Sequence, residues 1–290
     1  MKKIFILIIA ILASSSAFFV INNPTNVKEL IAQYTDNIRA AIPPPAPSAE
    51  VVEIANKASF TDYAKELFYR AQPEIISDRN AFNLACQSPS SSKTVELGCY
   101  SSTNKIYLLN IADPALHSQI VVTAAHELLH SAYTKINSSD RTNISKLIEK
   151  QLAIIKNKDL DTELNQYQIS EPGQRDNELH SIIGTEYGPL SKELESYYSK
   201  YFTNRSSLVQ FSKQFKDVFD KLQTNINIIG EQIKSTKSKM QNYLTNGNFK
   251  QYNLLVPKVN NLISNYNDNV DKYNKLSRNL LGIETGINNQ

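Results

Sequence analysis

The stretch Ala124-Ala125-His126-Glu127-Leu128-Leu129-His130 places two of the chain's four histidines four residues apart. Side chains at this spacing project from the same face of an α-helix, so both imidazoles can bind one Zn²⁺ ion. The carboxylate of Glu127, beside the first histidine, can then reach a water molecule on that ion and act as a general base. The stretch therefore predicts a helix that carries a metal site with hydrolytic chemistry.

The residues before this motif predict where its helix begins. Asp113-Pro114 offers an Asp N-cap and a proline at the first helical position, and no helix breaker follows before about Tyr133. Apolar residues recur every four positions and predict one buried stripe: Leu116, Ile120, Ala124, Leu128. The two histidines lie about 200° around the helix from Ala124, so we expect the helix to pack on one side and bind metal on another.

A catalytic zinc ion usually takes three protein ligands and leaves its fourth position to water. The stretch Asp176-Asn177-Glu178-Leu179-His180-Ser181 resembles the Asn-Glu-x-x-Ser helix of gluzincin metallopeptidases, a group of the zincins. This resemblance covers residues 114–186 and implies that Glu178 binds zinc together with His126 and His130. His180 and Glu186 are the competing candidates for the third ligand.

Two departures from known motifs bear on this assignment. The metzincin motif requires Gly and His at the positions of Tyr133 and Ile136, so the sequence excludes that class. Gluzincins often carry an acidic residue directly after the serine of the second motif, where it orients a zinc-bound histidine. This chain has Ile182 there, which leaves open how its histidines are oriented.

The resemblance implies hydrolysis of peptide bonds in a protein or peptide substrate, with Zn²⁺ as the cofactor. Glu127 takes the proton of the zinc-bound water and passes it to the leaving amine. His180, Tyr187 or Tyr133 could donate a hydrogen bond to the oxyanion, and the sequence does not choose among them. Residues 105–109 resemble the zincin strand that pairs with an extended substrate, and an ordinary core strand is the alternative.

Two other functions stay open at this stage. The chain could be an interaction or scaffold protein of the cell envelope, in which the zinc site is structural or inactive. It could also be a zinc amidase that acts on cell-wall peptides, since that chemistry needs the same metal site. The presence of Glu127 favours an enzyme, because a purely structural zinc site needs no general base.

The amino terminus predicts targeting to a membrane. Lys2 and Lys3 precede an uncharged run from residue 4 to 21, which is about 27 Å long if helical. We therefore expect residues 1–21 to be a signal anchor, giving a single-pass protein of the cell membrane with an extracytoplasmic C-terminal domain. Ser15-Ser16-Ala17 offers a cleavage site, so secretion after signal-peptide removal is the alternative. In an exported chain, Cys86 and Cys99 predict a disulfide bond.

The remaining chain divides into a linker and two folded segments. Residues 22–48 contain Pro43-Pro44-Pro45-Ala46-Pro47 and predict an extended linker. Residues 49–205 predict a zincin-like domain with several helices and a small antiparallel sheet between residues 81 and 111. Residues 206–290 predict an antiparallel helical hairpin, or coiled coil, around the turn Asn246-Gly247-Asn248. The expected fold class is therefore α+β and predominantly helical.

Composition narrows the range of partners. The 41% hydrophobic content of the 290 residues supports a packed core. Basic and acidic residues nearly balance, at 31 and 28, and no basic stretch interleaved with aromatics marks a nucleic-acid interface. We expect a peptide substrate and no nucleic acid, with self-association or partner binding through the hairpin as a further option and plain packing as its alternative.

Overall fold

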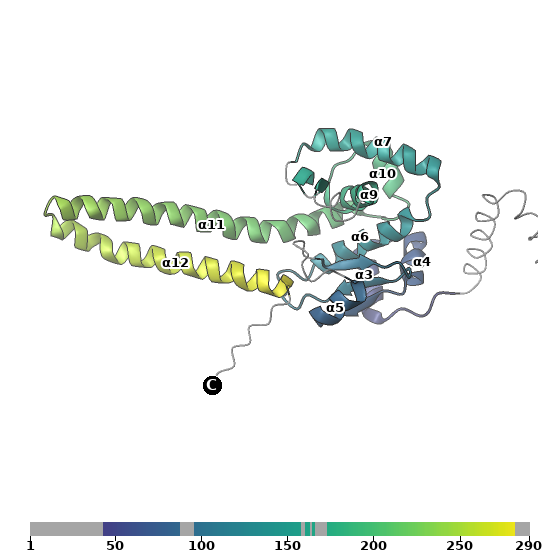
Figure 1. Cartoon of the computed structure of the whole chain (residues 1–290), viewed down its shortest axis with the longest axis horizontal. Coiled ribbons are helices and arrows are strands. Elements are labelled where there is room, and N and C mark those ends of the chain that lie inside the picture. The colour runs from purple at the N-terminus through teal and green to yellow at the C-terminus, as the bar shows by residue number, and fades with distance from the viewer. Residues whose placement is uncertain (1–42, 88–95, 158–159, 163, 166–172, 282–290) are drawn as a thin grey trace, which may run out of the picture. The chain divides into compact units, whose positions relative to one another are not determined.

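The structure is a computed structural model that describes residues 43–87, 96–157, 160–162, 164–165 and 173–281. Helices dominate, and three short strands form one sheet. Figure 1 shows the two long helices α11 and α12 side by side, extending away from the part of the chain that holds the shorter helices and the sheet. The predicted mixture of many helices and one small sheet is thus confirmed.

The first three described helices begin at capping side chains, as their sequences favour. Ser48, Thr61 and Asp78 each accept a hydrogen bond from a backbone N–H in the first turn of the helix that follows. These helices are α3 (Ala49–Lys57), α4 (Asp62–Arg70) and α5 (Arg79–Cys86). Their apolar faces pack into the main core of the protein or, for Phe82 of α5, into a smaller cluster beside it.

The sheet is mixed, so the prediction of an antiparallel sheet was wrong in part. Its strands are β1 (Glu74–Ile76), β2 (Gly98–Tyr100) and β3 (Ile106–Leu109), in the order β1-β3-β2. β2 pairs with β3 antiparallel, whereas β1 pairs with β3 parallel. The central position of β3 means that both of its edges are occupied, so residues 105–109 form a core strand and offer no edge to a substrate.

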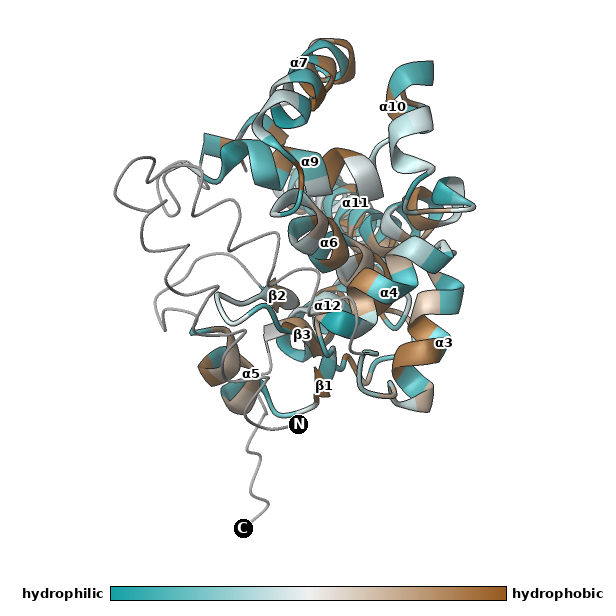
Figure 2. Ribbon diagram, turned by 90° about the vertical axis from the view of Figure 1, so that its right-hand side faces the viewer, coloured by the Kyte–Doolittle hydropathy of each residue, from teal (hydrophilic) through white to brown (hydrophobic). Residues whose placement is uncertain are grey.

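Helix α6 (Gln119–Tyr133) carries the two-histidine motif through the middle of the protein. It contacts α9 (Arg175–Glu186) on one side and the sheet with α3 and α4 on the other, an arrangement that Figure 2 also shows. Nearly every side chain from Ile120 to Ala132 is buried, so α6 packs on more faces than the single predicted stripe. The motif therefore lies between two layers of the protein.

The start of α6 differs from the sequence prediction. The Asp113 carboxylate accepts a hydrogen bond from the backbone N–H of Ala115, at 3.0 Å, and Leu116 bonds back to the carbonyl of Asp113. Gln119 then bonds to the carbonyl of Leu116. Both of these backbone hydrogen bonds join residues three positions apart, as in a turn. Asp113 therefore caps a turn, and the helix begins at Gln119.

After the two-histidine motif the sequence predicts helices at residues 140–156, 176–183 and 191–202, and the structure has helices there with shifted ends. They are α7 (Ser138–Ile155), α9 and α10 (Lys192–Tyr198). A glycine often marks the end of a helix, but Gly184 lies inside α9, which continues to Glu186. A Cβ atom at Gly184 would lie 2.5 Å from Leu129 Cδ1 and 2.6 Å from Tyr198 Cε1, so this glycine allows α9 to approach α6 and α10 closely. The sequence also predicts a helix at residues 159–168, which lies partly outside the described residues.

Two long helices complete the described chain. α11 (Arg205–Thr245) and α12 (Phe249–Leu281) pack along each other and are joined by a turn that contains Gly247 (Figure 1). Pro257 lies inside α12, so this helix begins before the proline and not at it. The predicted pair of helices is present, while a coiled-coil packing between them stays a prediction.

The base of α11 is joined to α9 by a buried arginine. Arg205 donates from Nε to the Glu195 carboxylate at 2.9 Å and from Nη1 to the carbonyl of Tyr187 at 2.7 Å. Its Nη1 also lies 3.3 Å from the carbonyl oxygen of Gly184. A buried guanidinium stabilises the fold only when such acceptors surround it, and here they belong to the last turns of α9 and to α10.

The predicted membrane-spanning anchor is not supported. Within the described ranges, no helix is both long and apolar enough to cross a membrane. Residues 1–21, on which the anchor and the single-pass location in the cell membrane were predicted, lie outside the described residues, as does most of the linker at 22–48. We therefore correct the sequence interpretation on this point and do not retain the membrane-spanning location.

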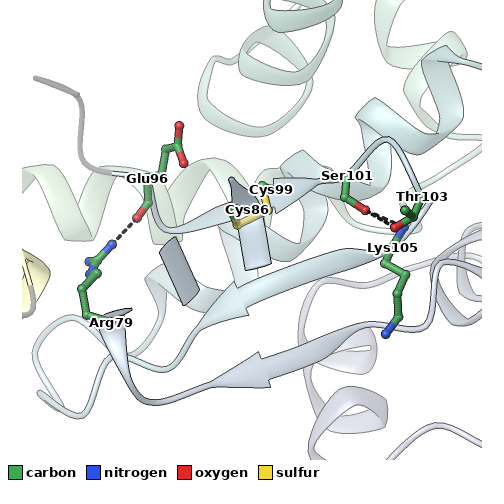
Figure 3. The surroundings of a disulfide bond; sticks show 7 residues. All are labelled: Arg79, Cys86, Glu96, Cys99, Ser101, Thr103 and Lys105. Atoms are coloured by element: carbon green, nitrogen blue, oxygen red, sulfur yellow. Dashed lines mark hydrogen bonds between the residues drawn. A yellow bond between two sulfur atoms is a disulfide. The ribbon is translucent and has the colours of Figure 1, made fainter. Parts of the chain in front are cut away.

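The predicted disulfide bond is confirmed. Cys86, the last residue of α5, is bonded to Cys99 in the middle of β2 (Figure 3). Next to it, the Arg79 side chain of α5 donates a hydrogen bond to the carbonyl of Glu96 at 2.6 Å. Both links hold β2 against α5, and β2 in turn contacts the α6 helix.

Candidate metal centre

Three side chains from two helices converge at one point. His126 and His130 come from α6 and Glu178 from α9, and their donor atoms all lie within 4.8 Å of one another. The Glu178 carboxylate oxygens lie 3.5 Å from His126 Nε2 and 3.4 Å from His130 Nε2. Two ligand atoms around a tetrahedral zinc ion, with bonds of about 2.0–2.1 Å, stand about 3.3 Å apart. The cluster therefore has a donor set and spacing that could bind a metal ion.

The cluster lies in a cleft of about 610 Å³. One wall comes from β2 and the loop that follows it, and the opposite wall comes from α6 and the start of α9. The side chains of Glu178 and His130 are 9% and 10% exposed, and that of His126 is 17% exposed. The three ligand candidates are thus shielded from bulk water but open to the cleft on the side of His126.

A neighbour of Glu178 orients the second histidine. The Nδ1 atom of His130 lies 3.0 Å from Asn177 Oδ1, while Asn177 Nδ2 donates to Gln174 Oε1 at 3.3 Å. The side-chain oxygen of Asn177 faces the imidazole and can only accept a hydrogen bond, so Nδ1–H donates to it. The lone pair of His130 then lies on Nε2, the atom that faces Glu178. Asn177 therefore orients His130, a role that gluzincins often give to an acidic residue at the position where this chain has Ile182.

Replacing Asn177 with alanine is expected to weaken metal binding by about 10–100-fold, because outer partners of this kind hold the ligand tautomer and ring position. Titration of the metal-free protein with zinc, in competition with a chromophoric chelator, measures the change. Asn143→Ala is the matched control, since Asn143 is exposed on α7 and does not line the metal cleft. Equal affinity for both variants would contradict the role given to Asn177.

The charges in the cluster are strongly coupled. Burial disfavours the ionised form of Glu178, but the adjacent His130 and His126 outweigh burial and lower the pKa of this carboxyl. Burial likewise favours neutral His126, yet the Glu178 and Glu127 carboxylates raise its pKa to about 9. Burial lowers the pKa of His130. The carboxylate of Glu178 is therefore ionised and attracts a positive charge to this position.

Glu127 lies beside the cluster in the same cleft. It is 5% exposed, and burial raises the pKa of its carboxyl to about 8, while a hydrogen bond from the backbone of Tyr100 acts in the opposite direction. Gly98 makes room for this side chain, since a Cβ atom there would lie 3.0 Å from Glu127 Oε1 and 2.4 Å from Thr123 Cγ2. Gly98 and Tyr100 of β2 thus define the position of the Glu127 side chain.

The structure does not bring His180 to the cleft. Its side chain is fully buried, its Nε2 lies 2.8 Å from Tyr197 Oη, and its ring packs against Tyr133 and Tyr198. Burial lowers the pKa of His180 to about 3, so the ring is neutral. It packs on the side of α9 away from the cluster, as expected for a residue two positions from Glu178.

The other sequence candidates also lie outside the cleft. Tyr187 follows the last residue of α9, about 13 Å along the helix from Glu178, and its hydroxyl lies 3.4 Å from Asn157 Nδ2. Glu186 binds Lys216 of α11 at 2.7 Å. Tyr133 lines a separate surface pocket beside Arg141. Of the competing ligands, only Glu178 meets the two histidines.

Comparison with known proteins adds no assignment. No protein-family model, no curated protein and no solved structure matches this chain. The class of the site is therefore defined by its own geometry, as a cluster of two histidines and one carboxylate that could bind a metal ion. Any more specific function has to be argued from this cluster and the side chains around it.

Proposed function

We propose that this protein is a zinc-dependent metallopeptidase of the gluzincin type. The observation that carries the proposal is the meeting of His126, His130 and Glu178 in one cleft with the buried carboxylate of Glu127. The first three side chains supply a metal site, and the fourth supplies a base next to it. The short sequence resemblance to the two gluzincin helices supports the same assignment.

The donor set favours zinc with one open position. Two imidazoles and one carboxylate are ligands that zinc accepts readily, and a structural zinc site would normally use four protein ligands. Among the described residues, three such side chains gather at this point. A site with three protein ligands leaves room for water or a substrate oxygen, which is the arrangement of catalytic zinc.

The surroundings of Glu127 suit a general base. When bound, the zinc ion lowers the pKa of a water ligand and polarises the carbonyl of the bond to be cleaved. Glu127 accepts the proton of that water and later donates it to the leaving amine. Burial raises the pKa of this carboxyl to about 8 in the metal-free site. A zinc ion bound beside it would lower that pKa, so the carboxylate would be ionised at neutral pH and able to accept the proton.

The cleft offers an edge for an extended peptide. β2 is an edge strand of the described sheet, and Gly98, Cys99 and Tyr100 line the cleft together with the metal ligands. A peptide that pairs with this edge would run past His126 and Glu127. The proposed substrate is therefore an extended segment of a protein or peptide, held by β2 and not by the central strand β3.

Removal and return of the metal test this function. The full-length protein should bind about one zinc ion, lose cleavage of an unfolded protein substrate on treatment with a chelator, and regain it when zinc is added back. His130→Ala should lose both metal and activity. His117→Ala is the control, because His117 lies before α6 and outside the cluster. Failure to bind zinc, or cleavage that survives chelation, would contradict the proposal.

A further inference from the structure

The end of the α11–α12 hairpin has a basic surface. We define the tip as residues 232–260, which include the turn between the two helices. The sequence from 232 to 267 contains no Asp or Glu. All lysines of the tip are exposed: Lys234, Lys237, Lys239, Lys250, Lys258. In the described part of the chain, these lysines form one ion pair, a weak contact of 3.9 Å between Lys234 and Glu231.

Large apolar side chains are exposed at the same place. Leu244 is 42% exposed, Phe249 60% and Leu254 61%. They are not needed for the contact between the helices, which buries Thr236, Met240 and Val259 instead. Exposed apolar side chains that gather within a few residues of one turn are typical of a contact surface.

The position of the tip separates it from the metal centre. Figure 1 shows the turn at the end of α11 and α12 that is farthest from α6 and α9. The tip lysines lie within about 18 Å of the turn along the two helices. The apolar and basic side chains can therefore meet one surface together, while the cleft stays free.

We propose that the tip binds the surface of an anionic lipid bilayer. Leu244, Phe249 and Leu254 enter the boundary between headgroups and acyl chains, and the lysines remain at the lipid phosphates with their alkyl chains against the apolar layer. A bilayer receives protruding side chains without a matching pocket, whereas a protein partner needs a concave apolar surface of its own. The contact is peripheral and requires no helix across the bilayer.

A tryptophan at the tip reports directly on this contact. The chain contains no tryptophan, so Phe249→Trp gives a single tryptophan in the full-length protein, which is excited selectively at wavelengths that tyrosine does not absorb. Vesicles of phosphatidylglycerol should shift its emission to shorter wavelength, and brominated lipid should quench it. Ile154→Trp is the control, since Ile154 is 72% exposed on α7, outside the tip. Because the probe reports locally, binding through another part of the chain does not mimic the result.

Charge variants test the role of the lysines. In the Phe249→Trp protein, Lys239→Gln with Lys250→Gln should raise the lipid concentration for the half-maximal shift about 25-fold, at about fivefold for each lysine near an anionic surface. The control pair Lys150→Gln and Lys192→Gln removes the same charge from α7 and α10. The shift should weaken at high salt and with phosphatidylcholine alone.

Three outcomes would overturn the proposal. In the first, the tip tryptophan does not respond to anionic vesicles. In the second, the control at Ile154 responds equally. In the third, poly-glutamate shifts the emission and vesicles do not, which would make an acidic protein the partner of the tip.

Discussion

Glu127→Gln is expected to lower the turnover of peptide cleavage by about 10²–10⁴-fold, the usual contribution of a general base. Glutamine has the same shape as glutamate, so it still fits against Gly98 and can accept the hydrogen bond from the backbone of Tyr100. It cannot accept a proton from water at neutral pH. The loss should therefore appear in kcat, with zinc content and folding unchanged.

A second carboxylate of the same cleft provides the control. Glu96 also lines the cleft, and its charge raises the pKa of Glu127, but it is not part of the metal cluster. Glu96→Gln should keep most of the activity. Stopped assays on a fluorogenic peptide mixture, together with metal analysis of each variant, measure both effects. Wild-type turnover in Glu127→Gln would mean that the buried carboxylate is not the base.

The metal helix could be predicted because its signal is local. The spacing of His126 and His130 is read directly from the helical repeat. The resemblance of the short second motif favoured Glu178, with His180 and Glu186 left open, and the structure brings Glu178 to the two histidines. The tautomer of His130 could not be predicted, because it depends on a hydrogen-bond chain through Asn177 to Gln174. The position of Asn177 next to Glu178 in the sequence does not show that its side chain faces the Nδ1 atom of His130.

The sheet was harder to predict from the sequence. β1 has three residues, too few for the alternation that marks a strand, and its parallel partner β3 lies about 30 residues later in the chain. The order of the strands decides which edges are open: β3 is central, and β2 is the edge strand at which we propose that a substrate binds. Gly98 likewise showed no sequence signal, since its role depends on the approach of β2 to α6.

Two helix boundaries differ from what the sequence favours, one at the start of α6 and one near the end of α9. Asp113 has the right type and position for an N-cap, but its carboxylate closes a turn with Ala115 and the helix begins six residues later. Glycine is common at helix ends, yet Gly184 lies inside α9, because a larger residue would collide with Leu129 of α6. At Asp113 a competing local turn overrode the N-cap preference, whereas at Gly184 packing against α6 and α10 overrode the preference of glycine for a helix end.

Glu178→Gln is expected to reduce zinc affinity by at least about 100-fold, because loss of a direct ligand should exceed the 10–100-fold cost of losing an outer partner. An amide is neutral and cannot hold the charge of the ion between the two histidines. The same change removes one of the carboxylates that raise the pKa of His126, so this histidine should titrate at lower pH in the metal-free variant. Competitive metal titration and NMR of the imidazole protons measure the two effects.

Glu186→Gln is the matched control on the same helix. Glu186 lies eight residues from Glu178, binds Lys216 at 2.7 Å and was the rival ligand in the sequence. Its ion pair is partly exposed, so its loss should change stability by at most about 1 kcal/mol and leave zinc affinity as it was. Because both variants remove one carboxylate from α9, a nonspecific effect of charge would weaken zinc binding in both. If only Glu178→Gln loses zinc affinity, Glu178 is the third ligand. If only Glu186→Gln loses it, Glu186 is the ligand and the assignment to Glu178 is wrong.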